Sequence, residues 1–177
     1  LGEGHLSISL MDRDEFDEAC QHLLVFDRKT GVTVGTYRMQ TLECAQEAGG
    51  FYTEQEFDIA ALGHEFAERS VELGRACVAK EHRNKIVLFL LWQGLIAYTE
   101  FHGKSNFFGC SSLTSQDMDE GLRLYAQLKS SGYLHPSLST KPHPDWCCTA
   151  SQPIETGFLK RVKVPNLFRA YLRQGSL

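Results

Sequence analysis

Two short apolar runs near the beginning of the chain are separated by a polar turn. His22–Asp27 (HLLVFD) and Val32–Met39 (VTVGTYRM) are rich in β-branched and large apolar residues, and residues 28–31 between them are polar and end in glycine. Runs of this kind around a short turn predict a β-hairpin. A third run, Ser70–Val78 (SVELGRACV), predicts a strand that carries two charged residues among apolar neighbours.

The middle of the chain alternates between helical and strand patterns. Arg83–His102 is apolar on almost every side, which predicts a helix buried against a sheet. Asn106–Leu113 predicts a return to strand. Ser115–Ser131 predicts an amphipathic helix that begins with acidic residues, as the dipole of a helix favours.

Less regular stretches lie between and after these elements. Residues 51–62 predict a loop followed by a short helix, and residues 135–153, with four of the five prolines, predict a long connection. Val164–Arg173 predicts a short last helix. The order of hairpin, strand, helix, strand and helix predicts a mixed α/β fold, and 177 residues suit one compact domain over residues 1–177.

Charge is distributed unevenly along the chain. Residues 1–72 hold 5 basic and 15 acidic side chains, whereas residues 73–177 hold 13 and 7. This division favours two kinds of charged partner over a nucleic acid, which requires a basic domain. The composition, 42% hydrophobic and 23% charged, excludes a disordered or coiled-coil chain, and no apolar run reaches the roughly 20 residues that a bilayer requires.

Six cysteines stand at irregular spacing without a CxxC pair. Cys77 and Cys110 lie in apolar, strand-like stretches, where a reduced thiol packs as a small hydrophobic group. We therefore expect a reducing, cytoplasmic environment. No signal peptide is visible, and the chain does not begin with Met, so we expect that a segment was removed or was never included.

The core strand carries Glu72 and Arg75 between residues that belong inside the fold. A buried ionised group costs several kcal/mol unless it has a partner. Arg38 in the hairpin, and Asp14 and Asp17 before it, are the obvious partners. The five charges together predict one ion-pair network.

Glu72 and Arg75 are three positions apart, so on a regular strand they point to opposite faces. A β-bulge at Gly74 adds one residue and brings Arg75 toward the face of Glu72. Bulges of this kind often lie beside active sites. The alternative is an ion-pair network that only fixes the sheet, because such networks also perturb pKa values.

Several short motifs together resemble the bacterial ornithine N-acyltransferases, relatives of N-acyl amino acid synthases and acyl-homoserine lactone synthases. The resemblance covers most of residues 14–175 and rests on Glu-Leu-Gly-Arg at 72–75, Cys-Val at 77–78, His-Arg-Asn at 82–84, residues 50–58 (GFYTEQEFD), 108–112 (FGCSS) and 171–173 (YLR). In acyl-homoserine lactone synthases, an acidic pair, an Arg and a Glu-x-x-Arg match Asp14 and Asp17, Arg38, and Glu72 with Arg75.

The resemblance implies an α/β fold of the acyl-CoA N-acyltransferase (GNAT) type. Its sheet is mixed and mostly antiparallel, is flanked by helices and has a splayed or bulged core strand. From the resemblance we expect the 177 residues to form one domain that lacks family segments at both ends. The implied reaction moves a (3-hydroxy)fatty acyl group from acyl carrier protein to the α-amino group of an amino acid, L-ornithine first of all, in ornithine-lipid synthesis.

Two alternatives stay open beside this function. One is a synthase that acylates another amino acid, such as tyrosine or glycine. The other is a non-catalytic module that binds acyl chains or a protein partner.

Attack of an amine on a thioester requires a base and an oxyanion site. Glu72 is the expected base, because a partly desolvated carboxylate accepts a proton readily. The backbone N–H groups of Cys77, Val78 and Ala79 are the expected oxyanion donors. The Cys77 thiol is an alternative nucleophile, but no His at a local spacing activates it, which favours a packed thiol.

The residues before the long helix (Arg83-Asn84-Lys85) contain no glycine, whereas acetyl-CoA enzymes of this fold cradle pyrophosphate there with a glycine-rich loop. We therefore expect no bound cofactor and a donor that is phosphopantetheine-linked acyl carrier protein rather than acyl-CoA. The expected phosphate or carrier-protein contacts are Lys80, Arg83, Asn84 and Lys85, with Lys160, Arg161 and Lys163 as further candidates. Ordinary solvated basic residues are the alternative.

The acidic half of the chain suits a cationic acceptor such as ornithine. Candidates for this acceptor site are Glu54, Glu56, Asp58 and Ser111, and the alternative is a polar loop. Candidates for the wall of an acyl tunnel are Leu88, Leu91, Trp92, Phe107 and Phe108, and the alternative is ordinary core.

A cluster of metal-capable side chains lies in the proline-rich connection: His135, His143, Asp145, Cys147 and Cys148. Their spacing matches no standard zinc pattern, so we expect no metal site. The expected partners are acyl carrier protein and the amino acid, without nucleic acid, and a product that associates peripherally with a membrane.

Overall fold

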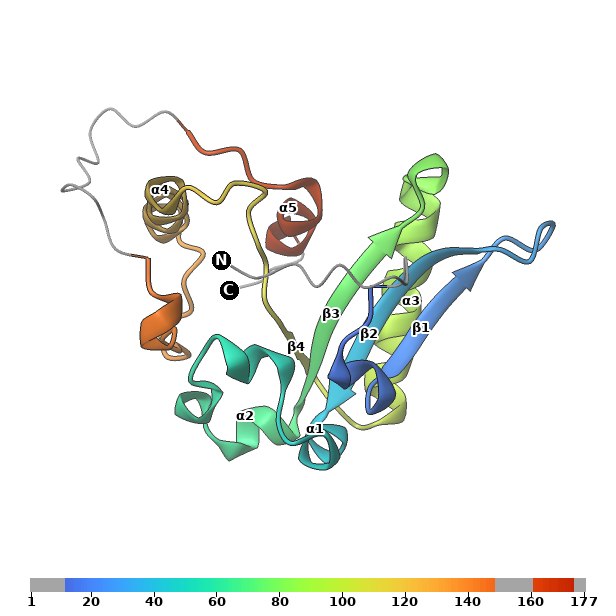
Figure 1. Cartoon of the computed structure of the whole chain (residues 1–177), viewed down its shortest axis with the longest axis horizontal. Coiled ribbons are helices and arrows are strands. Elements are labelled where there is room, and N and C mark those ends of the chain that lie inside the picture. The colour runs from blue at the N-terminus through green and yellow to red at the C-terminus, as the bar shows by residue number, and fades with distance from the viewer. Residues whose placement is uncertain (1–11, 149–160, 174–177) are drawn as a thin grey trace. The chain divides into compact units, whose positions relative to one another are not determined.

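The computed structural model describes residues 12–148 and 161–173 (Figure 1). The chain divides into two compact units. The first comprises Leu1–Tyr52 and Glu65–Phe108, and the second comprises Thr53–His64 and Gly109–Leu177. A single domain over residues 1–177 stays a prediction.

The first unit contains a four-stranded sheet in the order β1-β2-β3-β4. The strands are β1 (Gln21–Phe26), β2 (Thr33–Thr41), β3 (Ser70–Val78) and β4 (Asn106–Phe108). β1 and β2 form the predicted hairpin, β2 and β3 are antiparallel, and β3 and β4 are parallel. A parallel pair requires a crossover, which α3 (Lys85–Phe101) supplies. The predicted mixed, mostly antiparallel sheet is therefore confirmed.

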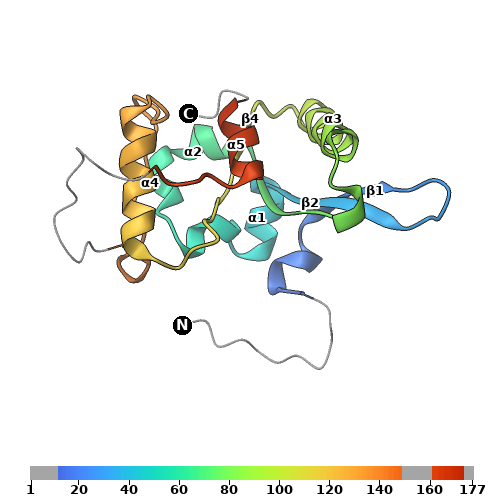
Figure 2. The ribbon, with the colours of Figure 1, turned by 90° about the horizontal axis from the view of Figure 1, so that it is seen from above.

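Helix α3 lies against one face of the sheet, opposite the short 3-10 helix Glu15–Glu18 (Figure 2). Its buried positions recur every four residues at Val87, Leu91, Leu95 and Thr99. Two glycines allow the close approach. A Cβ at Gly35 would lie 2.8 Å from Val87, and one at Gly94 would lie 2.6 Å from Leu23.

The opposite side of α3 carries apolar residues that are exposed: Ile86, Phe89, Leu90, Ile96 and Phe101. The predicted burial of this helix against a sheet is confirmed along one stripe, because a single sheet face covers only one side of a helix. The apolar pattern reports how apolar the helix is and not how many neighbours it has.

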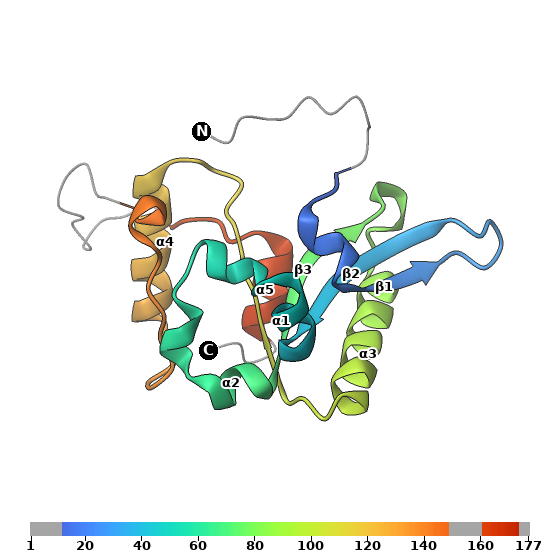
Figure 3. The ribbon, with the colours of Figure 1, turned by 60° about the horizontal axis from the view of Figure 1, so that its bottom comes forward.

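Two short helices of the first unit were not predicted. α1 (Leu42–Ala48) follows β2 and ends at Gly49, which adopts a left-handed conformation (φ 85°). α2 (His64–Glu68) precedes β3 (Figure 3). Both are too short to show a helical period, so local composition does not separate them from loops.

The second unit contains α4 (Met118–Ser130) and, near the end, α5 (Asn166–Arg173), both close to their predicted positions. The strand predicted over Asn106–Leu113 is shorter than expected, because β4 ends at Phe108 before Gly109, whose φ is 156°. Short 3-10 helices span Tyr52–Gln55, Ile59–Leu62, Lys80–His82 and Pro144–Trp146. In the part of the chain that is described, none of the helices has the length and apolar character needed to cross a bilayer.

Candidate active site

A β-bulge interrupts β3 in the middle of the sheet. Opposite β2, the pairing passes from Thr36–Cys77 to Arg38–Gly74, so two residues of β3 face Tyr37 alone. Arg75 adopts a left-handed backbone conformation with a φ of 50°, which is unusual for a residue with a Cβ. The predicted bulge is therefore present but was misplaced at Gly74. It lies one residue later and involves Arg75 itself.

The bulge decides which side chains share a face. Partners in an antiparallel pair point to the same side, so the Gln40–Glu72 and Thr36–Cys77 pairs place Glu72 and Cys77 on one face. Without the extra residue, Cys77 would point to the opposite face. Cys77 is exposed, which corrects the prediction of a packed thiol.

Beyond the bulge, β3 has an open edge. β4 pairs only with Ser70–Glu72, so the later part of β3 separates from it. Ala79 N–H donates to Val34 O at 2.9 Å, and N–H directions alternate along an antiparallel strand. Cys77 N–H therefore also faces β2, and only Val78 N–H is directed toward the open edge. Ala79 and Cys77 were thus wrong as oxyanion donors.

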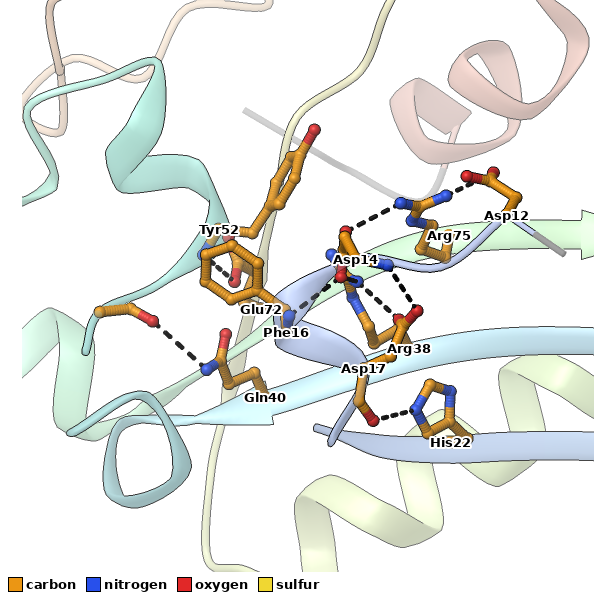
Figure 4. A network of polar contacts seen from close by, with 11 residues as sticks. Asp12, Asp14, Phe16, Asp17, His22, Arg38, Gln40, Tyr52, Glu72 and Arg75 are labelled. Atoms are coloured by element: carbon orange, nitrogen blue, oxygen red, sulfur yellow. Dashed lines mark hydrogen bonds and ion pairs between the residues drawn. The ribbon is translucent and has the colours of Figure 1, made fainter. Parts of the chain in front are cut away.

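An ion-pair network covers the face of the sheet opposite α3 (Figure 4). Arg38 donates to Asp14 at 2.6 Å and to Asp17 at 2.8 Å, and Arg75 donates to the other oxygen of Asp14 at 2.8 Å. Arg75 also binds Asp12. The predicted roles of Asp14, Asp17, Arg38 and Arg75 as network partners are confirmed. Asp12 was missed, because it is an exposed carboxylate and the sequence does not show which acidic residues of this segment reach Arg75.

Local structure prepares both aspartates for this network. Asp14 accepts from Phe16 N–H and Asp17 accepts from Asp14 N–H, a reciprocal cap that fixes the 3-10 helix. The guanidinium of Arg38 lies 5.6 Å from the ring centroid of Phe16 and 5.2 Å from that of Tyr52. Arg38 thereby lies against two rings that also pack edge to face on each other at 5.5 Å, a favourable environment for a cation.

The network shifts the pKa values of its members in the directions expected for ion pairs. Burial acts to raise the pKa of Asp14, but hydrogen bonds from Arg38 and Arg75 outweigh it and lower this pKa to about 2. For Arg38, burial acts in the opposite direction, and the bonds to Asp14 and Asp17 raise its pKa. Hydrogen bonds to Asp14 and Asp12 raise the pKa of Arg75. All these groups are charged at neutral pH.

Glu72, the fifth predicted member, is buried (5% exposed) and makes a distinct contact. Its Oε2 accepts from Tyr52 N–H at 2.9 Å. This bond ties the core strand to the chain that follows α1. Glu72 thus combines a desolvated carboxylate with a fixed orientation, which a general base requires.

A small hollow reaches Glu72 from the network face. Its volume is about 10 Å³, close to the space that one water molecule requires. The residues that matter most in its lining are Cys20, Arg38, Gln40, Tyr52, Glu72 and Gly74. Cys20, Tyr52 and Gly74 are half-buried, so the hollow communicates with solvent. Burial raises the pKa of Cys20 to about 11, which keeps its thiol protonated.

Sequence reasoning missed Cys20, Gln40 and Tyr52 as lining residues. Gln40 looks like an ordinary strand residue of the hairpin, and only its register with Glu72 reveals its place.

The predicted carrier-binding residues Lys80, Arg83, Asn84 and Lys85 lie between β3 and the start of α3. Asn84 Oδ1 accepts from Ile86 N–H at 3.0 Å and from Val87 N–H at 3.1 Å, so it caps the helix. Arg83 donates to Val78 O at 3.2 Å. Carrier binding by these residues stays a prediction.

The predicted tunnel residues contribute to packing in the first unit. Leu91 is fully buried, the rings of Trp92 and Phe107 are 6.3 Å apart, and Phe108 packs on Phe51 at 5.0 Å. Leu88 is half-buried. These contacts agree with ordinary core, and a tunnel stays a prediction.

Residues expected to bind the acceptor belong to the second unit: Glu54, Glu56, Asp58 and Ser111. Glu54, Asp58 and Ser111 are exposed, and Glu54 O contacts His143 Nε2 at 3.0 Å. Their role in acceptor binding stays a prediction. Among the further basic candidates, Lys160 lies outside the described residues, and Arg161 and Lys163 are exposed.

The metal-capable cluster of the proline-rich connection has other contacts. His143 binds a backbone carbonyl, and His135 Nδ1 accepts from Leu138 N–H at 2.8 Å. Within residues 12–148 and 161–173, no group of three or more His, Cys, Asp or Glu side chains is placed to hold a metal ion.

Comparison with known proteins finds relatives whose sequences align with much of this chain. The chain is similar to several proteins named L-ornithine N(alpha)-acyltransferase, including those of Brucella abortus, Rhizobium meliloti and Agrobacterium fabrum. That of Brucella abortus is 42% identical over 112 residues, which are 60% of this chain and 40% of the relative. Those of Rhizobium meliloti and Agrobacterium fabrum are each 33% identical over 94% of this chain, and over 59% and 60% of their own lengths. The chain thus spans 40–60% of these relatives.

The family comparison covers the strands that form the site. Residues 2–93 match the model of the family described as Acetyltransferase (GNAT) domain. The matched region includes the hairpin, the bulged β3 and the first half of α3. Because the match covers more than half of the chain and agrees with its mixed sheet, the chain belongs to the GNAT acetyltransferase domain family.

Proposed function

We propose that this chain carries the reaction centre of an N-acyltransferase that moves a 3-hydroxyacyl group from acyl carrier protein to the α-amino group of L-ornithine. One observation carries the proposal. The buried carboxylate of Glu72 lies beside the bulge of a splayed strand and lines a hollow that communicates with solvent. The names of the relatives support the substrate.

The reaction forms a C–N bond and breaks a C–S bond. The neutral amine attacks the thioester carbonyl, its proton passes to Glu72, and collapse of the tetrahedral intermediate expels the pantetheine thiolate, which takes up that proton. Glu72 is suited to this step because its carboxylate is desolvated and oriented by Tyr52 N–H.

The intermediate carries an oxyanion that requires a hydrogen-bond donor. Val78 N–H suits this role, because it points to the open edge of β3. The carbonyl of Val78 accepts from Arg83, which fixes the peptide on that side. The acyl carbonyl therefore binds along β3, a few residues beyond Glu72.

Capping of α3 supports a carrier-protein donor. The N–H groups of Ile86 and Val87, which a pyrophosphate would use at a helix start, already donate to Asn84. A phosphopantetheine arm carries one phosphate and depends less on such a cradle. Lys80, Arg83 and Lys85 supply positive charge for that phosphate or for the acidic carrier surface.

The charges around the site favour a cationic acceptor. Asp12, Asp14, Asp17 and Glu72 outnumber Arg38 and Arg75. The surplus of negative charge attracts the side-chain ammonium of ornithine. Glycine and tyrosine have no cationic side chain and gain no such attraction.

The test incubates the purified protein with 3-hydroxyacyl carrier protein thioesters and a panel of amino acids, and identifies products by mass spectrometry. Ornithine conjugates support the proposal. Conjugates of tyrosine or glycine alone overturn the acceptor, and no conjugate from a folded protein favours a non-catalytic acyl-binding module.

The Glu72→Gln variant tests the base. We expect its kcat to fall about 10²-fold to 10⁴-fold, the usual contribution of general base catalysis, while the circular dichroism spectrum is unchanged. Glu81→Gln, which replaces an exposed carboxylate near the end of β3, is the matched control and should retain activity. A folded Glu72→Gln variant with full kcat would exclude Glu72 as the base.

A further inference from the structure

Gln40 carries a buried hydrogen-bond acceptor that has no partner among residues 12–148 and 161–173. Its side chain is 1% exposed, and its Oε1 is the buried side-chain atom that remains unbonded among the described residues. An unsatisfied buried acceptor costs free energy, so each such atom in a native protein requires an explanation.

The orientation of the amide is fixed by its other end. Gln40 Nε2 donates to Gly50 O at 3.3 Å. Rotation of the amide by 180° would place two oxygens against each other, so Oε1 must point away from Gly50. Figure 4 shows this oxygen on the side of Glu72 and Tyr52. Gln40 and Glu72 are direct partners across β2 and β3, so their side chains emerge together.

The surroundings of Oε1 define what it binds. Gln40 and Glu72 line the same hollow of about 10 Å³, and both present oxygens that accept hydrogen bonds. Two acceptors are joined only by a group that donates twice, and the volume fits one water molecule. An amino acid is too large to enter.

We propose that Gln40 is a positioning residue of the acyl-transfer site, whose Oε1 holds one water molecule against Glu72. The water takes the proton of the attacking amine and passes one of its own protons to the carboxylate, so that it is regenerated as Glu72 becomes neutral. The proton later leaves Glu72 for the pantetheine thiolate. This role rests on the proposed function and adds to it the route by which the amine reaches a buried base.

Gln40→Met tests the proposal, because Met has a similar length and lacks the strong acceptor. We expect kcat to fall about 2-fold to 10-fold, as for loss of one hydrogen bond between neutral groups, with KM for ornithine within twofold of the original. The ascending limb of the pH profile of kcat should move, since the water no longer couples Glu72 to the amine. Tm should fall only slightly, because the variant loses the hydrogen bond from Nε2 to Gly50 O but leaves the apolar packing of β2 in place.

Thr41→Val is the matched control. Thr41 is the next residue on β2, is equally buried at 1% exposed, and lies on the opposite face of the strand. This variant should retain kcat and its pH profile. Equal losses of kcat in both variants, together with a much lower Tm, would show a structural effect and overturn the proposal, as would a Gln40→Met variant with unchanged kcat.

A crystal structure of the unliganded protein tests, without any activity assay, whether the water is present. We expect a water within about 3.0 Å of both Gln40 Oε1 and a Glu72 oxygen, the outer limit for a good O–H···O hydrogen bond, and its loss in Gln40→Met. A dry hollow overturns the role of Gln40 whether or not the protein acylates ornithine. An inactive protein that holds the water instead contradicts the proposed function alone.

Discussion

The two faces of the sheet in the first unit differ in what the same strands bury: one face packs apolar side chains, and the other holds charged and polar side chains. On one face, Gly35 of β2 and Leu23 of β1 receive α3 in close apolar contact. On the other, Arg38 and Glu72 lie buried among charges and hydrogen bonds. Alternating residues of one strand therefore serve packing and chemistry in turn.

The two faces differ in the free energy of burying their side chains. Burial of apolar groups on the α3 face stabilises the fold by about 25 cal/mol per Å². Each charge on the network face loses its hydration free energy, and only an ion-pair or hydrogen-bond partner offsets that loss. Substitutions on the apolar face should therefore weaken the fold, and substitutions on the polar face should be tolerated when charges are removed together.

The largest effect on stability is expected on the apolar face. Leu91→Ala removes a fully buried side chain from the contact between α3 and β2. We expect the free energy of unfolding to fall by about 3 to 4 kcal/mol, within the range for buried Leu→Ala changes, as measured by urea denaturation. Phe89→Ala, on the same helix but 60% exposed, should cost less than about 1 kcal/mol. Equal losses would contradict the assigned face of α3.

A smaller effect is expected when one charge is removed from the polar face. Arg38→Met leaves Asp14 and Asp17 without their shared partner and should cost about 2 to 3 kcal/mol, less than for a fully buried pair because both carboxylates retain about a fifth of their exposure.

The compensating variant sharpens this test. Adding Asp17→Asn to Arg38→Met should recover part of the loss, as a double-mutant cycle would show. Arg28→Met in the exposed hairpin turn is the control and should change stability by less than about 0.5 kcal/mol. Absence of coupling between positions 17 and 38 would contradict the network.

The smallest effect is the acid dependence of the network. Asp14 has its pKa lowered from 3.8 to about 2, so its carboxylate stabilises the folded state above the unfolded pKa near 4. This contribution, about 2 kcal/mol, is lost as the pH falls from about 4 to 2. Asp14→Asn should flatten the stability profile in this window.

Glu43 offers a contrast with a similar pKa. Its hydrogen bond from Lys104 lowers the pKa to about 2, but the carboxylate is largely exposed. Added salt at about 1 M should therefore weaken the contribution of Glu43 and spare most of that of Asp14. Equal salt sensitivity of the two acid transitions would contradict the burial of the network.

The parts of this architecture that were predictable are those for which a residue pattern is compatible with only one structure. β3 has the predicted bounds Ser70–Val78, and the ion pairs of Arg38 follow from the cost of burying a lone charge. The bulge was predicted at Gly74 because glycine tolerates strained backbone, yet Arg75 adopts the left-handed conformation. Its guanidinium is held by Asp12 and Asp14, which is a tertiary effect that no local rule contains.

The sequence by itself determined the alternation of strands and helices and the need to neutralise Arg38 and Glu72, because hydrophobic period and desolvation act on every residue locally. Only the tertiary structure decided that β4 leaves β3 after Glu72, that Val78 rather than Ala79 has the outward N–H, and that Gln40 lies beside the carboxylate. These features depend on register between strands that are distant in sequence. A shift of one residue exchanges the faces of a strand, and register is set by the packing of the whole sheet.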